Sequence, residues 1–223
     1  MTEAEWLACT DTWPLLDFLT ERASDRKLRL FGVACCQRAE HFISNPRTAH
    51  AIAVAECYAD GLASNRQRLE AQRCCRPTAE DIAQGVRAVT SAMLLLQKRA
   101  ATGVRLATVC AARDVTEGGA AEGASGGIDP AWSAERAMQV RLLSDIFGNP
   151  FRSVAFAPEW RTDTAVSLAS LMYESRDFSA MPILADALQD AGCGDEQVLQ
   201  HCRDPHGVHV RGCWVVDLVL GKD

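Results

Sequence analysis

The residues best suited to chemistry lie close together near the end of the sequence. Between positions 193 and 213 the chain carries three of its ten cysteines and three of its five histidines. Thiolate sulfur and imidazole nitrogen are ligands of zinc and other transition metals, and a cysteine beside a histidine can also act as a nucleophile. This segment is therefore the first place to look for either a metal centre or a reactive thiol.

A metal site requires that several ligands reach one point. A short helix is expected from Asp195 to Cys202, and it would place Cys193 and Cys202 at its opposite ends. Ligands from the helix end and from the following loop, which contains proline and glycine, form a better local set. These candidates are His201, Cys202, His206, His209 and Cys213. Because the paired Cys-x2-Cys of common zinc motifs is missing, a structural zinc here is one hypothesis among several.

Two other interpretations of the same residues stay open. In the first, a cysteine is the nucleophile of an enzyme, a histidine is its base and an aspartate orients that base. The candidates are Cys213 or Cys202, His209 or His201, and Asp204 or Asp217. In the second, the residues serve packing, since Cys213 and Trp214 begin an apolar segment and free cysteine behaves as a small buried hydrophobe.

The elements that must position these residues are predicted to be helices. Alternating β-branched runs closed by tight turns are absent, and alanine is frequent. Apolar residues recur instead every three or four positions, from Leu28 to Phe42 and, in the longest stripe, from Ile82 to Cys110. The sequence predicts an all-α protein, either an irregular multi-helix bundle or an array of antiparallel helix pairs.

Capping residues and helix breakers predict where the helices begin. The expected starts are Thr2, Asp11 or Thr12, Ser24 or Asp25, Arg47, Ser64, Thr78, Asp129, Asp163, Ser179 or Met181, and Asp195, with a last apolar segment from Cys213 to Leu220. Five glycines between Glu117 and Gly127 predict a flexible loop. We expect a single helical domain over residues 1–223, which this loop could subdivide into residues 1–115 and 129–223.

The composition disfavours several classes of function. A net charge of −6 argues against a nucleic-acid-binding protein, which usually presents a basic face. No apolar run is long enough to span a membrane, and the first residues lack the features of a secretory signal. Ten cysteines without an export signal indicate reduced thiols, so we expect a cytoplasmic protein.

Several segments together resemble a known but uncharacterised group of proteins. They are Met1–Trp6, Ala23–Phe31 with Cys35 and Cys36, Asp145–Phe151, Leu184–Leu188, Gly192–Cys193, His201–Cys202 and His209–Trp214. This combination resembles a protein family expanded in planctomycete bacteria of the Gemmata type. The resemblance covers most of the chain except the middle, from Arg66 to Glu122. It implies a bacterial cytoplasm and carries no established activity.

The many amphipathic helices, with no recognisable catalytic motif, favour a non-enzymatic protein that binds a protein partner or acts as a scaffold. The alternatives are a zinc-binding protein with a structural metal at the C-terminal cluster, and an enzyme that depends on a Cys-His pair. No cofactor other than this zinc is expected.

Overall fold

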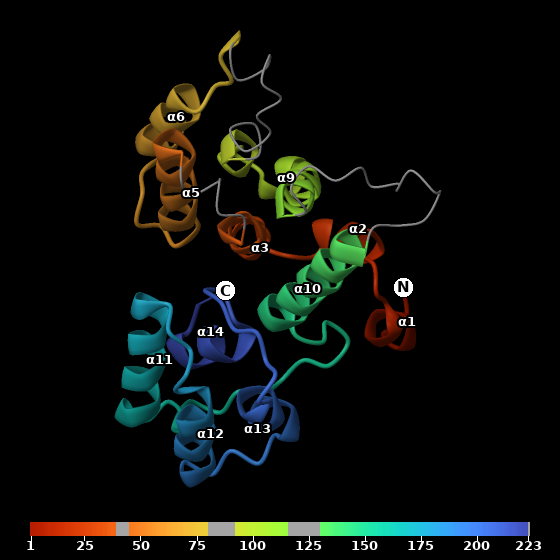
Figure 1. Cartoon of the computed structure of the whole chain (residues 1–223). Coiled ribbons are helices and arrows are strands. Elements are labelled where there is room, and N and C mark those ends of the chain that lie inside the picture. The colour runs from red at the N-terminus through yellow and green to blue at the C-terminus, as the bar shows by residue number, and fades with distance from the viewer. Residues whose placement is uncertain (39–44, 80–91, 116–129, 223) are drawn as a thin grey trace. The chain divides into compact units, whose positions relative to one another are not determined.

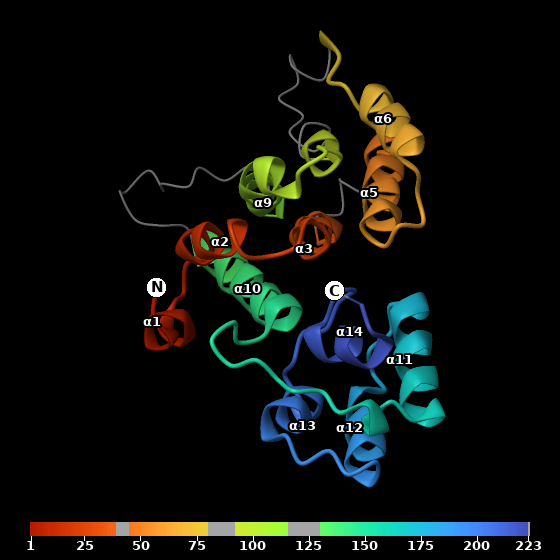
Figure 2. The same ribbon diagram turned by 180° about the vertical axis from the view of Figure 1, so that it is seen from behind.

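The computed structural model describes residues 1–38, 45–79, 92–115 and 130–222, and every regular element in these ranges is a helix. The all-α prediction is therefore confirmed for the described part of the chain. The chain forms two compact units, Met1–Val140 and Arg141–Asp223 (Figures 1 and 2). Their boundary lies inside helix α10 (Pro130–Phe147), whereas the sequence placed a subdivision at the glycine-rich loop, which lies outside the described residues.

Helix α3 (Asp25–Gln37) is the centre of the N-terminal unit. It packs against α5 (Pro46–Ala59) and α9 (Ala100–Val115), and α5 packs in turn against α6 (Asn65–Cys74), as Figure 1 shows. The predicted apolar stripe of α3 is buried at Leu28, Phe31 and Cys35. The unit begins with α1 (Glu3–Ala8) and α2 (Thr12–Thr20), whose caps are Thr2 and Asp11. Both caps lie where the sequence predicted helix starts.

The prediction of one continuous long helix from Thr78 to Cys110 is wrong. Residues 92–95 are helical, 96–99 form a turn and a bend, and α9 begins at Ala100, while residues 80–91 lie outside the described part. Two side chains of α3 form hydrogen bonds with the backbone at the break. Arg29 donates to the carbonyls of Gln97 (2.9 Å) and Lys98 (3.2 Å), and Asp25 accepts from the amide of Ala100 at 2.8 Å. Hydrophobic periodicity carries no information about such contacts, so it could not locate the break.

The C-terminal unit is built from four helices that follow the last turns of α10. They are α11 (Asp163–Ser175), α12 (Met181–Asp190), α13 (Glu196–Arg203) and α14 (Trp214–Leu220), preceded by a 3-10 turn, Pro158–Trp160. Helix α11 packs against α12 and α14, and α13 packs against the same two helices (Figure 2). Their shared core includes Leu184, Leu188, Val198 and Val216. The predicted start of α13 is confirmed, because Asp195 accepts from the amide of Gln197 at 2.9 Å.

None of the described helices combines the length and the apolar character needed to cross a bilayer.

Two apolar residues of α12 provide a test of where the core of the C-terminal unit lies. Leu188 is fully buried, whereas Ile183 on the same helix is 58% exposed. We expect Leu188→Ala to lower the free energy of unfolding by about 2–5 kcal/mol, because it leaves a cavity in a packed core. Ile183→Ala should change it by less than about 0.5 kcal/mol. Urea unfolding of both variants measures the difference, and equal effects would contradict this core.

Candidate metal centre

Four side chains of the C-terminal unit meet at one point. Asp145, His201, His209 and Cys213 each offer one ligand atom, and these atoms lie within 4.8 Å of one another. Asp145 Oδ1 is 2.8 Å from His209 Nδ1 and 3.2 Å from His201 Nε2, which is itself 3.2 Å from Cys213 Sγ. Around a tetrahedral zinc ion, neighbouring ligand atoms are about 3.3 to 3.6 Å apart, given the usual metal–ligand distances. The three separations given above are slightly shorter than this, and the remaining pairs lie within 4.8 Å, so the four atoms could reach one zinc ion after small shifts.

Asp145 lies in the last turn of α10, and its side chain is only 2% exposed. A negative charge is unfavourable there, because the C-terminal end of a helix carries a partial negative charge and burial removes water. The amide of Val210 donates to Oδ2 at 3.0 Å, which leaves Oδ1 facing the two histidines. Burial is the largest influence on the pKa of Asp145 and opposes ionisation, but hydrogen bonds from His201 and His209 outweigh it and lower that pKa. The site therefore holds a buried carboxylate that attracts positive charge.

His201 comes from the last turn of α13. The helix is anchored by its neighbours, since Val198 and Cys202 are buried in the core and Arg203 donates to Asp186 at 2.8 Å. The imidazole of His201 lies 4.9 Å from that of His209 and 5.2 Å from the indole of Trp214, measured between ring centroids. Its position is therefore set by packing on two sides as well as by Asp145.

His209 is placed by the turn that follows α13. The amide of Gly207 donates to the carbonyl of Asp204 at 3.0 Å, with Pro205 second in the turn, the order that a type I turn favours. The side chain of His209 is only 8% exposed. Its Nε2 lies against Gly207 so closely that a Cβ on this residue would come within 2.6 Å of it. Glycine at position 207 is therefore what leaves room for the ring.

Cys213 follows a second turn, in which its amide donates to the carbonyl of Val210 at 3.0 Å. Gly212 has a φ of 92°, a left-handed conformation that strongly favours glycine. The thiol of Cys213 is fully buried, and burial, followed by the charge of Asp145, raises its pKa well above the usual value. The free thiol is therefore neutral, and a bound metal would displace its proton because metal coordination requires the thiolate.

Three of the five ligands proposed from the sequence belong to this group, and two do not. Cys202 points into the helical core, where burial and then the charge of Asp145 raise its pKa to about 12. His206 is exposed, and its carbonyl accepts from the guanidinium of Arg141. Neither of the aspartates suggested as an orienting group, Asp204 and Asp217, joins the cluster. Asp145, which was not among the residues predicted from the sequence, contributes the carboxylate of the cluster instead.

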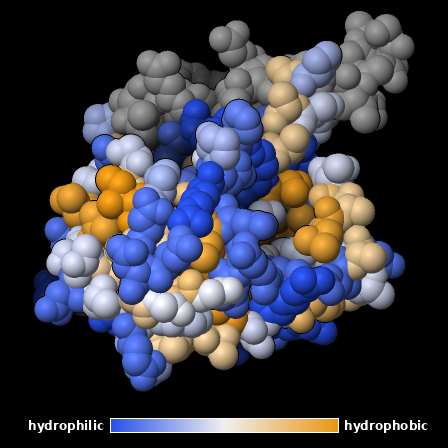
Figure 3. All heavy atoms as spheres, turned by 90° about the horizontal axis from the view of Figure 1, so that it is seen from below, coloured by the Kyte–Doolittle hydropathy of each residue, from blue (hydrophilic) through white to orange (hydrophobic). Residues whose placement is uncertain are grey.

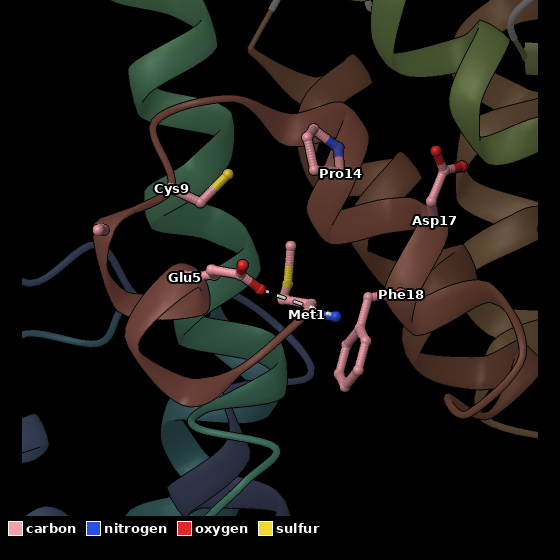
Figure 4. A pocket seen from close by; sticks show the side chains of 7 residues that line it. Met1, Glu5, Cys9, Pro14, Asp17 and Phe18 are labelled. Carbon is pink, nitrogen blue, oxygen red and sulfur yellow. Dashed lines mark ion pairs between the residues drawn. The ribbon is translucent and has the colours of Figure 1, made fainter.

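The N-terminal unit contains a hollow whose polar groups do not converge on one point (Figure 4). It has a volume of about 610 Å³ and lies between α1 and α2. Its polar groups already have partners: Glu5 accepts from the amide of Thr2 at 2.7 Å, the Cys9 thiol donates to the carbonyl of Asp11 at 3.2 Å, and Asp17 pairs with Arg105. The converging ligand atoms are in the C-terminal unit, which is therefore the better candidate for a functional site.

Comparison of the chain with protein-family models, with curated proteins and with solved structures gives no match. The resemblance to the planctomycete family therefore stays a prediction.

Two glycines of the C-terminal unit give a matched test of the geometry around His209. Gly207→Ala would press a methyl group against the His209 ring, whereas a Cβ at Gly194 would meet no atom within 4 Å. Disturbing the groups that orient a metal ligand commonly lowers metal affinity about 10–100-fold. We expect a loss of this size for Gly207→Ala, because it displaces the His209 ring. Gly194→Ala should bind zinc as the unmodified chain does. A competition titration with a zinc chelator measures both, and equal affinities would contradict the placement of His209.

Proposed function

We propose that the C-terminal unit binds one zinc ion and that Asp145, His201, His209 and Cys213 are its ligands. The observation that carries the proposal is the position of His201 Nε2, which faces both Asp145 Oδ1 and Cys213 Sγ at 3.2 Å. An imidazole nitrogen offers either one proton or one lone pair, so it cannot serve two such partners equally. A cation between the three groups accepts all of their lone pairs at once.

The donor set and its charge favour zinc. One sulfur, two nitrogens and one oxygen are ligands that tetrahedral zinc accepts, whereas calcium and magnesium are bound by oxygen alone. A zinc ion with one thiolate, one carboxylate and two neutral imidazoles has no net charge. Neutrality matters here because Asp145 and Cys213 are buried, and an unbalanced buried charge is costly.

The proposed metal is structural. A structural zinc site has four protein ligands, while a catalytic one keeps a position open for water or substrate. All four positions here come from the chain, and the side chains of Asp145, His201 and His209 are 2%, 18% and 8% exposed. The ion would join the end of α10, the end of α13 and the start of α14, which are separate in sequence.

The same geometry disfavours the Cys-His enzyme. A cysteine nucleophile must be a thiolate within reach of its substrate, but Cys213 is fully buried and its pKa is raised well above the usual value. In a triad the carboxylate orients the histidine through the ring nitrogen that is not used as the base. Here Asp145 and Cys213 face the same nitrogen of His201. The arrangement is therefore better suited to coordination than to proton transfer.

The role in protein interaction that the helices suggested remains a proposal and is compatible with a structural metal. Within the described ranges, the most exposed large apolar residues belong to different segments; they are Leu7, Leu62, Leu106, Leu171 and Ile183. On the face that Figure 3 shows, hydrophobic side chains form separate groups among hydrophilic ones. A partner surface is therefore less clearly defined than the metal centre.

Metal analysis of the full chain, purified without a histidine tag, tests the proposal. We expect about one equivalent of zinc per chain, since four convergent ligands make one site. Cys213→Ser should lose most of the metal. Cys202→Ser is the matched control, because it alters a neighbouring buried thiol outside the cluster, and His206→Ala controls for loss of a histidine. Zinc below about a tenth of an equivalent after reconstitution, or equal loss in Cys202→Ser, would contradict the proposal.

A further inference from the structure

A pocket of about 360 Å³ lies beside the candidate metal centre, within the C-terminal unit. Its walls come from the connection between α11 and α12 and from the turn after α13. Phe178, Met181, Pro182 and Pro205 give it an apolar lining, and His209 forms part of its wall. This volume is within the range of pockets that bind small organic molecules, about 300–1,000 Å³.

One polar atom in this wall, Nε2 of His209, is free to bind a ligand. His209 directs Nδ1 to Asp145, and the opposite edge of the ring, with Nε2, lies against Gly207. Gly207 and His209 both line the pocket and Asp145 does not, so this edge of the ring is the one that faces the pocket. The His209 side chain is more than nine-tenths buried, and no described residue forms a hydrogen bond with its Nε2. Nε2 is not one of the fully enclosed polar atoms without a partner, so it is open to the pocket, where a ligand can contact it.

If zinc binds at the proposed site, it determines that Nε2 of His209 is a hydrogen-bond donor. This inference rests on the proposed function. When Nδ1 of a neutral imidazole binds a metal, the proton lies on Nε2, which becomes a donor. Metal-bound histidines usually donate this second N–H to an acceptor, which orients the ring and makes it a stronger ligand. For His209, the acceptor would have to come from the pocket.

We propose that the pocket binds a small uncharged molecule that carries a carbonyl oxygen beside an apolar group. The carbonyl accepts from His209 Nε2–H, and the apolar group lies among Phe178, Met181 and the two prolines. Both a neutral carbonyl and a carboxylate could accept this hydrogen bond, and the charges of the pocket wall distinguish between them. The charged residues of the wall are Arg176, Asp177 and Asp204, one cation and two anions, so the wall disfavours a negatively charged ligand.

Ligand and metal are coupled through the same ring. An acceptor on Nε2 strengthens the bond from Nδ1 to zinc, so a filled pocket raises zinc affinity. Because coupling between two binding sites is reciprocal, bound zinc raises the affinity for the ligand by the same factor. Binding of a ligand in the pocket would then change the affinity of this unit for the zinc ion that joins its helices.

Phenylacetamide and the isosteric phenylacetate test this pocket in the full-length protein. Each is titrated into the zinc-loaded and the zinc-free chain while nuclear magnetic resonance follows the Nε2–H proton of His209. We expect phenylacetamide to shift that proton and to bind the zinc-loaded chain about fivefold or more tightly than the zinc-free chain. Phenylacetate should bind at least about tenfold more weakly than phenylacetamide. Ser179→Phe, which places a ring in the pocket wall, should abolish binding, and Ser179→Ala should preserve it.

The outcomes separate this proposal from the metal site. Zinc uptake with no binding of phenylacetamide, or with binding that does not shift the His209 proton, overturns the pocket and leaves the metal site standing. Tighter binding of phenylacetate overturns the assignment of an uncharged ligand. Binding of phenylacetamide by a chain that takes up no zinc overturns the proposed metal site and the coupling together.

Discussion

The buried carboxylate of Asp145 is the constraint on which the C-terminal unit depends. It lies at the end of α10, where the helix itself disfavours a negative charge, and its side chain is 2% exposed. The groups around this carboxylate stabilise its negative charge. Two imidazoles face Oδ1, and the amide of Val210 donates to Oδ2. A zinc ion would complete this compensation, because it supplies the two positive charges that the carboxylate and a Cys213 thiolate require.

The turns and helix ends of the C-terminal unit bring the four candidate ligands together. Turns at Gly207 and Gly212 shape the loop between α13 and α14, so His209 and Cys213 both face the end of α10. Gly148, with a φ of 60°, ends α10 against the indole of Trp214, the residue that follows Cys213. The helices pack through a conventional apolar core, while the loop that connects two of them is organised by polar atoms. The apolar core therefore positions the helices, and the turns and polar contacts position the ligand atoms between them.

Local signals in the sequence predicted the helices well, and they failed where distant side chains decide the structure. Capping residues such as Thr2 and Asp195 act within one turn, so their positions could be read directly. The break between residues 95 and 100 depends on Arg29 and Asp25, which lie far away in the sequence. The glycine-rich segment falls outside the described residues.

In the candidate site, too, local signals could be read from the sequence and distant contacts could not. His201, His209 and Cys213 were found because they cluster in the sequence, whereas Asp145 comes from another helix. A signal for Asp145 was present: it lies three residues after the buried Leu142, so an acidic side chain borders the apolar face of α10. A charge on such a face, at the unfavourable end of a helix, indicates a compensating cation. Cys202 could not be excluded beforehand, because only the packing of α13 turns its thiol into the core.

X-ray absorption at the zinc edge, recorded on the full-length zinc-loaded chain, tests the central claim most directly. It counts the atoms around the metal and separates sulfur from nitrogen and oxygen by distance. Coordination by Asp145, His201, His209 and Cys213 predicts one sulfur at about 2.3 Å and three nitrogen or oxygen atoms at about 2.0–2.2 Å. A shell with two or more sulfurs, with no sulfur, or with six light atoms would contradict it.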